Sequence, residues 1–284
     1  MNLKQNPFSV YDFLGYFTPG ALGLYTLFLL EPHAAANLKL KAPDGRSLIF
    51  DDPQLFVPFV LFAYGLGHVL SYLSSVIVEK YSIWSLGYPS KYLLGLRVYG
   101  FWEVGKDKGR GLRFLSRFVF GLILAPIALF DAVFLRLFSG KSMIGRPLDP
   151  LLTRIIMRNV GTLLREKSGV RNLDDYGTPV ATDYFRFAYH FAVENCPRHL
   201  AKMQNYVALY GFLRTLTLIA ALFWWLVVVH LALTGLSLEL AATAAVLTAL
   251  VLVFYLAFVK FYRRFNLEVY MAVSTCGAVN PDPI

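Results

Sequence analysis

The sequence predicts an all-α integral membrane protein with four transmembrane helices and a helical cytoplasmic insert between the second and third. Of its 284 residues, 57% are hydrophobic and only 16% are charged, whereas soluble domains carry roughly 25% charged residues. Four apolar runs are long enough to cross a bilayer, which takes about 20 residues. The formal net charge of +9 indicates a basic face toward anionic lipid, nucleotide or nucleic acid.

The four predicted spans come in two pairs. The first pair lies at about 12–30 and 55–78, and the second at about 212–236 and 238–261. Almost no residues separate the last two runs, so we expect a tight helical hairpin. No signal-type cleavage site follows the first run, and we therefore expect the cell to retain it as a span.

The distribution of Lys and Arg predicts the orientation. Basic residues gather at 80–117 and 139–211 and after the fourth span, whereas the loop joining the last two spans has none. Because Lys and Arg mark the cytoplasmic side, both termini are predicted to be cytoplasmic and the loop 31–54 extracytoplasmic. The predicted parts are a first membrane pair (1–79), a basic cytoplasmic insert (80–211), a transmembrane hairpin (212–261) and a cytoplasmic tail (262–284).

A fifth apolar run at 118–138 is long enough to span, but Pro126, Asp131 and Arg136 interrupt it. If it crossed, the two basic segments flanking it would lie on opposite sides of the membrane. Four crossings keep both inside, so we expect a re-entrant, interfacial or buried helix here, and a fifth crossing is the alternative. A re-entrant backbone would need protein or a water-filled cavity around it.

Three helices are predicted within the insert. Apolar residues in 148–167 recur at helical spacing. Residues 182–196 and 198–211 read as two helices that break at Cys196-Pro197. The second of these continues into the third span, so a single helix over 198–236 would connect insert and membrane rigidly.

Two arginine triplets are candidate binding sites for an anionic ligand. Guanidinium groups match phosphate oxygens and stay charged, and helical spacing puts each triplet on one helix face. The alternative is a solvated face with headgroup anchors. The two triplets are Arg110, Arg113 and Arg117, and Arg154, Arg158 and Arg165.

Polar and helix-disturbing residues within the apolar runs are candidates for a pore or gate. His68 lies near the middle of the second span, where it could line a pore or bond to another helix. Asp131 would be a gate residue if 118–138 dips into the membrane, and Pro19 is expected to bend the first span. Trp224 and Trp225 fall near mid-span, so their ring N–H groups need partners on another helix or subunit.

No catalytic, cofactor or metal motif stands out, so an enzyme is not expected and neither a cofactor nor a metal is predicted. "GKDKGRG" lacks the spacing of a phosphate loop. His190, Glu194 and His199 could serve a metal or a membrane-embedded enzyme acting on lipid-linked substrate. Zinc, however, needs three or four ligands at recognisable spacing, and a helix–helix contact is the alternative.

The opening segment "NPFSVYDFLGYFTPG" resembles the start of bacterial membrane effectors of anti-phage defence systems, the Hailong channel effector most of all. A Tyr-Asp pair and a Gly-Tyr-x-x-Pro-Gly run open the first span in such proteins. The resemblance implies a homo-oligomeric, channel-like toxin controlled through its cytoplasmic part. It implies no particular site residues.

The expected function is thus that of an oligomeric effector of a bacterial inner membrane, an ion channel or membrane-disrupting toxin. A tetramer is expected because four crossings alone do not easily enclose a conducting path. The expected partners are the lipid bilayer and an oligonucleotide, nucleotide or regulatory protein bound to the basic insert. The alternatives are the membrane-embedded enzyme and a non-catalytic scaffold of a membrane complex.

Overall fold

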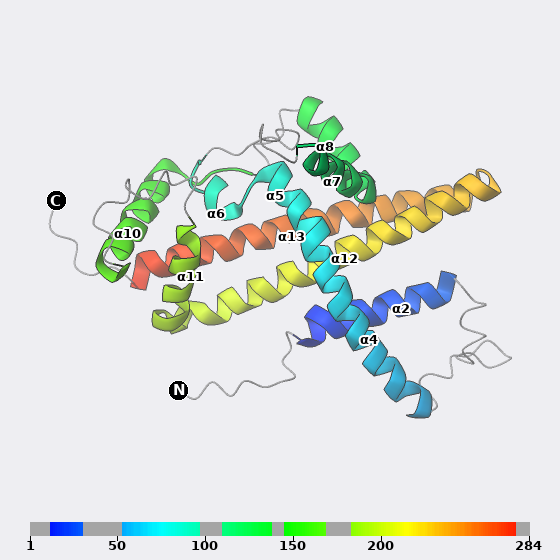
Figure 1. The fold of residues 1–284 in the computed structure, drawn as a ribbon, viewed down its shortest axis with the longest axis horizontal. Helices are drawn as coiled ribbons and strands as arrows, with labels where there is room; N and C mark the ends of the chain where they lie inside the picture. Colours follow the sequence, from blue (N-terminus) through cyan, green and yellow to red (C-terminus); the bar gives the residue numbers. More distant parts are fainter. Residues whose placement is uncertain (1–11, 31–52, 97–109, 138–144, 169–182, 277–284) are drawn as a thin grey trace. The chain divides into compact units, whose positions relative to one another are not determined.

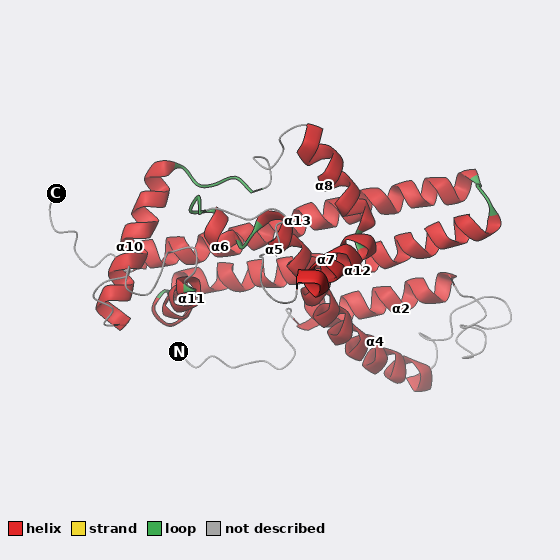
Figure 2. Ribbon diagram, turned by 45° about the horizontal axis from the view of Figure 1, so that its top comes forward, coloured by secondary structure: helices red, strands yellow, loops and turns green. Residues whose placement is uncertain are grey.

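A computed structural model describes residues 12–30, 53–96, 110–137, 145–168 and 183–276 (Figure 1). Within these ranges the chain is helical and contains no strand (Figure 2). The helical elements are η1 (Phe13–Phe17), α2 (Thr18–Leu30), α4 (Pro53–Ser74), η2 (Ser75–Glu79), α5 (Lys80–Leu86), α6 (Pro89–Tyr92), α7 (Arg110–Ile123), α8 (Ala125–Leu137), α10 (Pro150–Ser168), α11 (Tyr184–Asn195), α12 (Pro197–Thr234) and α13 (Leu238–Cys276).

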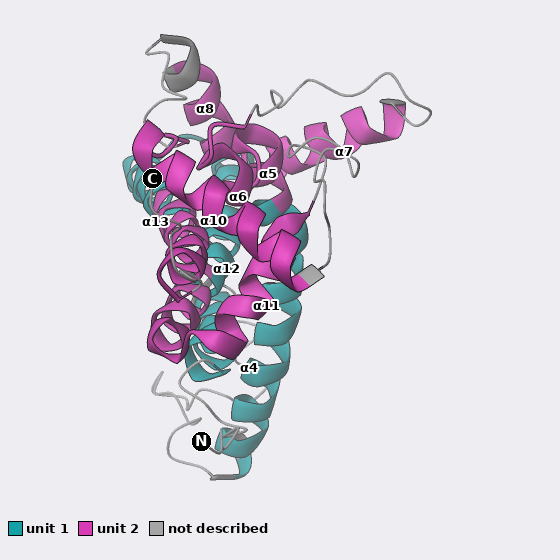
Figure 3. Cartoon of the chain, turned by 90° about the vertical axis from the view of Figure 1, so that its left-hand side faces the viewer, with its two compact units in different colours: residues 1–79, 211–255 teal, residues 80–210, 256–284 magenta. Residues whose placement is uncertain are grey.

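Contacts divide the chain into two compact units (Figure 3). Unit 1 comprises 1–79 and 211–255, and unit 2 comprises 80–210 and 256–284. The boundaries at 210/211 and 255/256 fall inside α12 and α13. Each of these two helices therefore contributes one end to each unit.

Three helices among the described residues are long and apolar enough to cross a membrane: Phe56–Tyr92, Pro197–Thr234 and Leu238–Cys276. They contain the second, third and fourth predicted spans, so the chain is a multi-pass membrane protein. The first predicted span, 12–30, is helical but is not among them. Its α-helix α2 has 13 residues, about 20 Å, against a hydrocarbon thickness of about 30 Å.

The surfaces of these helices fit a bilayer. Large apolar side chains project outward from α4, α12 and α13 rather than into the protein. Examples are Phe62, 69% exposed on α4, and Leu233, 81% exposed on α12. Lipid chains solvate such side chains at no cost, whereas water does not. The apolar faces therefore indicate contact with the bilayer.

The segment 118–138 is not one straight helix. It forms the end of α7 and all of α8, and the two helices meet at a 100° bend between Ile123 and Ala125. Pro126 lies in the first turn of α8, where its missing N–H group leaves no hydrogen bond unmade. Each helix alone is about 20 Å long, so a crossing by this segment would have to be a broken one.

The predicted helices of the insert are present. α10 covers 150–168, α11 ends at Asn195, and α12 begins at Pro197. α12 continues for 38 residues without interruption, so the continuous helix expected over 198–236 is confirmed through Thr234. The hairpin turn is as short as predicted, because only Gly235 to Ser237 separate α12 from α13. Gly235 adopts a positive φ of 92° in this turn.

One feature of unit 2 was not expected. α13 runs on from the fourth predicted span through residue 276, so most of the segment predicted as a tail is helix. This extension supplies the centre of the unit 2 core, where Val269, Tyr270 and Val273 are fully buried. Around it pack Ile156 and Val160 of α10, with further residues of α11 and α12.

In unit 1, glycines allow the first helical segment to lie directly against α4. A Cβ atom on Gly67 would come within 1.8 Å of the Tyr16 carbonyl oxygen, and one on Gly20 within 1.8 Å of the Ala63 carbonyl oxygen. Before Pro19 the backbone widens into the π turn η1, in which the Thr18 N–H donates to the Phe13 carbonyl. The close packing of this segment against α4 therefore rests on Gly20 and Gly67.

Gly67→Ala should destabilise unit 1 because its new methyl group would collide with backbone that cannot rotate away. Overpacking of this kind costs about 1–3 kcal/mol, and we expect a lower melting temperature of the detergent-purified protein. Gly65→Ala is the matched control, because no atom lies within 4 Å of a Cβ at that position. Equal melting temperatures for the two variants would contradict the close approach.

Candidate functional site

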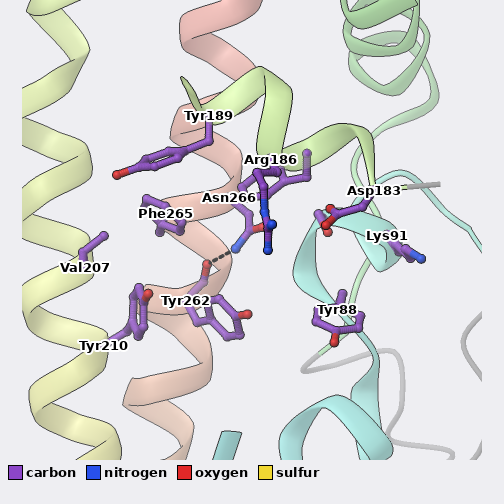
Figure 4. Close-up of a pocket in the computed structure, with 12 residues that line it drawn as sticks. Tyr88, Lys91, Asp183, Arg186, Tyr189, Val207, Tyr210, Tyr262, Phe265 and Asn266 are labelled. Atoms are coloured by element: carbon purple, nitrogen blue, oxygen red, sulfur yellow. Dashed lines mark hydrogen bonds between the residues drawn. The ribbon is translucent and has the colours of Figure 1, made fainter. Parts of the chain in front are cut away.

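Unit 2 contains an open pocket of about 570 Å³. Four separate stretches of chain form it, so no local sequence motif marked it (Figure 4). Its lining residues are Tyr88, Ser90, Lys91, Asp183, Phe185, Arg186, Tyr189, Val207, Tyr210, Tyr262, Phe265 and Asn266. The aromatic content of the chain, 16%, does not indicate where its rings come together.

Aromatic rings form one wall of the pocket. The ring centroids of Tyr210 and Tyr262 are 4.9 Å apart, and those of Tyr210 and Phe265 are 5.8 Å apart. Tyr189 meets Phe265 at 5.7 Å with the ring planes inclined by 63°. Such clustered rings offer flat faces and edges on which a planar ligand ring can stack.

Charged side chains form the opposite wall. Arg186 of α11 and Lys91 of α6 are the cations, and Asp183, directly before α11, is the carboxylate (Figure 4). The Lys91 ammonium group lies 5.9 Å from the centre of the Tyr88 ring. An arginine and a lysine suit phosphate oxygens, and a carboxylate accepts hydrogen bonds from a hydroxyl or amino group.

Buried hydrogen bonds hold the pocket in shape. The Tyr270 hydroxyl of α13 donates to the Ser90 carbonyl of α6 over 2.6 Å in a buried position. The Asn266 amide, only 2% exposed, donates to the Tyr262 carbonyl one turn earlier over 2.9 Å. The short helix that carries Lys91 is thereby fixed to the helix that carries the aromatic wall.

A second polar cluster lies within unit 1, at the ends of two apolar runs. Arg214 of α12 forms an ion pair with Glu79 at the end of the π turn η2. The Arg214 Nε also donates to the Ser74 hydroxyl over 3.2 Å, and Ser74 meets Thr215 at 3.2 Å. Arg214 thus has a carboxylate partner on another helix.

Asp131 of α8 is buried and bonded within unit 2. Its Oδ2 accepts hydrogen bonds from the Tyr81 hydroxyl over 2.9 Å and from the Ser85 hydroxyl over 3.1 Å, both on α5. It therefore fastens α8 to the helix that follows the second span. Its role as a gate residue stays a prediction.

The two arginine triplets differ in their surroundings. Arg154, Arg158 and Arg165 are all exposed on α10, opposite the buried side of that helix. In the other triplet, on α7, Arg113 is exposed and Arg117 is half-buried over the ring of Trp84, 5.4 Å from its centre. The pocket contains neither triplet, so binding of an anionic ligand by these arginines stays a prediction.

His68 is exposed on α4 and contacts two aromatic rings of unit 1. It stacks on Tyr16 with ring centroids 3.9 Å apart and meets the edge of Tyr64 at 4.6 Å. Trp224 donates its ring N–H to the Thr248 hydroxyl of α13 over 2.9 Å, which confirms the expected partner on another helix. Pore-lining roles for His68 and Pro19 stay predictions.

The three residues considered for metal or enzyme chemistry do not form one hydrogen-bonded group. His199 Nδ1 lies 2.7 Å from Glu268 Oε1 of α13, and its Nε2 lies 3.2 Å from the Thr275 hydroxyl. His190 and Glu194 are exposed on α11. Among the described residues no group of three His, Cys, Asp or Glu side chains is placed to hold a metal ion.

Comparisons of this chain with protein-family models, curated proteins and solved structures gave no significant match. Its function must therefore be argued from its own residues.

The ion pair between Arg214 and Glu79 should be required for the stability of unit 1. Both side chains are largely buried, with 12% and 22% exposure, and Arg214→Gln removes the cation that contacts the Glu79 carboxylate. A fully buried pair broken in this way costs roughly 3–5 kcal/mol, so for Arg214→Gln we expect about 2–3 kcal/mol and a clearly lower melting temperature.

Two controls accompany that measurement. The Lys202 ammonium group lies 3.8 Å from Glu268, and the Lys202 side chain is 65% exposed. Lys202→Gln should therefore change the free energy of unfolding by less than about 1 kcal/mol. The double variant Arg214→Gln/Glu79→Gln should recover part of the loss. A single Arg214→Gln variant as stable as the Lys202→Gln control would show that the pair is dispensable.

The two cysteines should differ in reactivity. Cys196 is fully buried, its thiol donating to the Ala272 carbonyl over 3.5 Å, and burial raises the pKa of that thiol to about 12. Only about one Cys196 in ten thousand is then a thiolate at pH 8, the form that reacts. N-ethylmaleimide should add one label per native chain, at the exposed Cys276, and two after denaturation.

Cys276→Ser provides the check on this assignment, because mass spectrometry should then find no label on the native chain. Rapid labelling of native Cys276→Ser protein would contradict the buried position of Cys196.

Proposed function

We propose that this chain is a multi-pass membrane effector controlled by a small anionic ligand, and that the pocket of unit 2 binds this ligand. One observation carries the proposal. Three of the four rings described in the aromatic wall, those of Tyr210, Tyr262 and Phe265, belong to α12 and α13, the two helices that continue into candidate spans. Tyr210 and Tyr262 lie next to the ends of the apolar runs, so whatever moves them also moves the inner ends of these helices.

The chemistry of the pocket favours a nucleotide. Arg186 and Lys91 can bind a phosphate, and the clustered tyrosines can stack on a base. Asp183 can accept a hydrogen bond from a ribose hydroxyl or an exocyclic amino group. An inorganic anion would contact only the charged wall, and an uncharged ring would contact only the aromatic wall, whereas a nucleotide can contact both.

Control of the membrane helices requires that the ligand binds one arrangement of α12 and α13 more tightly than another. Three features support such a coupling: the unbroken helices, the pocket at the ends of their apolar runs, and the ion pair that ties α12 to η2. We propose that in a bacterial inner membrane the response is the passage of ions through an assembly of several copies. Each copy would contribute its apolar helices to the contact.

Arg186→Glu should weaken ligand binding without unfolding the protein, because Arg186 is exposed. The probes are the nucleoside 5′-monophosphates, with ribose 5-phosphate and the free nucleosides for comparison. We expect a monophosphate to raise the melting temperature of the nanodisc-embedded protein and each partial probe to raise it less. The variant should bind about 10- to 100-fold more weakly, the equivalent of losing one charge-assisted hydrogen bond.

Arg154→Glu is the matched control, since it makes the same charge change on an exposed face outside the pocket. If a nucleoside 5′-monophosphate raised the melting temperatures of Arg186→Glu and wild-type protein equally, the pocket would be rejected as the binding site. For the membrane step, a potential-sensitive dye should report depolarisation in cells expressing the wild type and an altered response with Arg186→Glu. An unchanged potential at all expression levels would contradict ion passage.

A further inference from the structure

We propose that α7 is an interfacial helix: it lies in the plane of the membrane surface, with its apolar side among lipid chains and its arginines on anionic headgroups. This goes beyond the proposed function, since it assigns a lipid-binding surface to a segment that lines no part of the pocket. The occupant of this surface is the bilayer itself.

The first argument is the distribution of side chains around α7. Arg110, Arg113 and Arg117 follow one another at spacings of three and four and so share one face. At 100° per residue, Leu115 and Val119 point in the opposite direction. The arginines of this 14-residue helix therefore gather on one side, with the exposed Phe114 beside them, and apolar residues occupy the opposite side, as in helices that lie at a membrane surface.

The second argument is that the apolar side faces outward. Leu112 is 74% exposed, Leu115 is 56% exposed and Phe118 is 53% exposed. In a helix of a soluble domain this side would face the core. In α7 it is instead the basic side that is half-buried against protein, because Arg117 lies over the Trp84 ring. Such an outward apolar face needs an apolar surrounding.

The third argument places α7 at the level of the membrane surface. Trp84 of α5 stacks on Phe120 of α7, with ring centroids 5.3 Å apart. The apolar run of the second span ends at Val78 and is followed by the charged pair Glu79 and Lys80. Trp84 follows the end of that run by six residues in the sequence, and tryptophan is enriched near the ends of spans in membrane proteins.

Charge complementarity then selects lipid over a second copy of this chain. α7 carries three arginines and no acidic residue, so two such helices facing each other would place like charges together. Anionic phospholipid headgroups instead offer phosphate oxygens along the whole length of the helix. Long arginine side chains can reach these headgroups while the backbone lies deeper.

The proposal also accounts for the bend after α7. The 100° turn at Leu124 lets α7 follow the surface while α8 leaves that plane. Hydrogen bonds from Tyr81 and Ser85 to Asp131 hold α8 against α5, so the turn is fastened on its protein side.

Site-directed spin labelling tests the orientation directly. Single cysteines replace Leu112, Leu115 and Val119 on the apolar side and Arg113 on the basic side, in Cys276→Ser protein reconstituted in bilayers containing phosphatidylglycerol. The accessibility of each label to oxygen, which concentrates in lipid, is compared with that to a water-soluble nickel chelate. Labels on the apolar side should favour oxygen at one common depth, and the label at 113 should favour nickel.

Three results would overturn the proposal. Labels on the apolar side that neither reagent reaches would show that protein, such as a second copy, covers this face. Preference for nickel at these sites would place them in water, and a depth that increases steadily from 112 to 119 would mean that α7 enters the membrane steeply. Replacing phosphatidylglycerol by phosphatidylcholine tests the arginines separately from the apolar side, because it removes the anionic headgroups. The labels on the apolar side should then lie at a shallower depth. An unchanged depth would reject the role of the arginines.

Discussion

The backbone of a spanning segment must satisfy its own hydrogen bonds, because the bilayer core offers none. In this chain the requirement produces two helices of 38 and 39 residues, each about 57 Å long. That is nearly twice the hydrocarbon thickness of about 30 Å. Their excess length does not fray into loops. It becomes the framework of unit 2, where α13 provides the buried centre and α12 one wall of the pocket. The same two helices therefore supply candidate membrane spans and form part of the core of unit 2.

Much of this architecture could be predicted because hydrophobic length and Pro or Gly positions are local signals. The runs at 55–78, 212–236 and 238–261, the break at Pro197 and the turn at Gly235 all follow from neighbouring residues. The first segment was harder, since apolar composition at 12–30 does not say where a helix begins or whether a π turn widens it. The helix over 262–276 is harder to predict, because Lys260, Arg263 and Arg264 indicate the end of a span and do not indicate that the helix continues.

The pocket could not be predicted in the same way. Lys91, Asp183, Arg186 and Tyr262 are scattered over more than half of the sequence, and only tertiary packing brings them together. Similarly, His199 lies closer in sequence to Glu194 than to Glu268, yet Glu268 is its partner. Charge spacing within one helix indicates which residues share a face, as for the arginines of α7 and α10. It does not indicate whether that face meets protein, lipid or water, which depends on burial.

The ion pair between Arg214 and Glu79 has an electrical consequence. Moving one elementary charge through a membrane potential of 100 mV changes the energy by about 2.3 kcal/mol. Two opposite charges that move together carry no net charge, so they gain almost nothing from the field. α12 and α13 are joined by a three-residue turn and their backbone dipoles oppose each other. This ion pair and the paired helices of the hairpin therefore offer the electric field of a membrane little net charge on which to act.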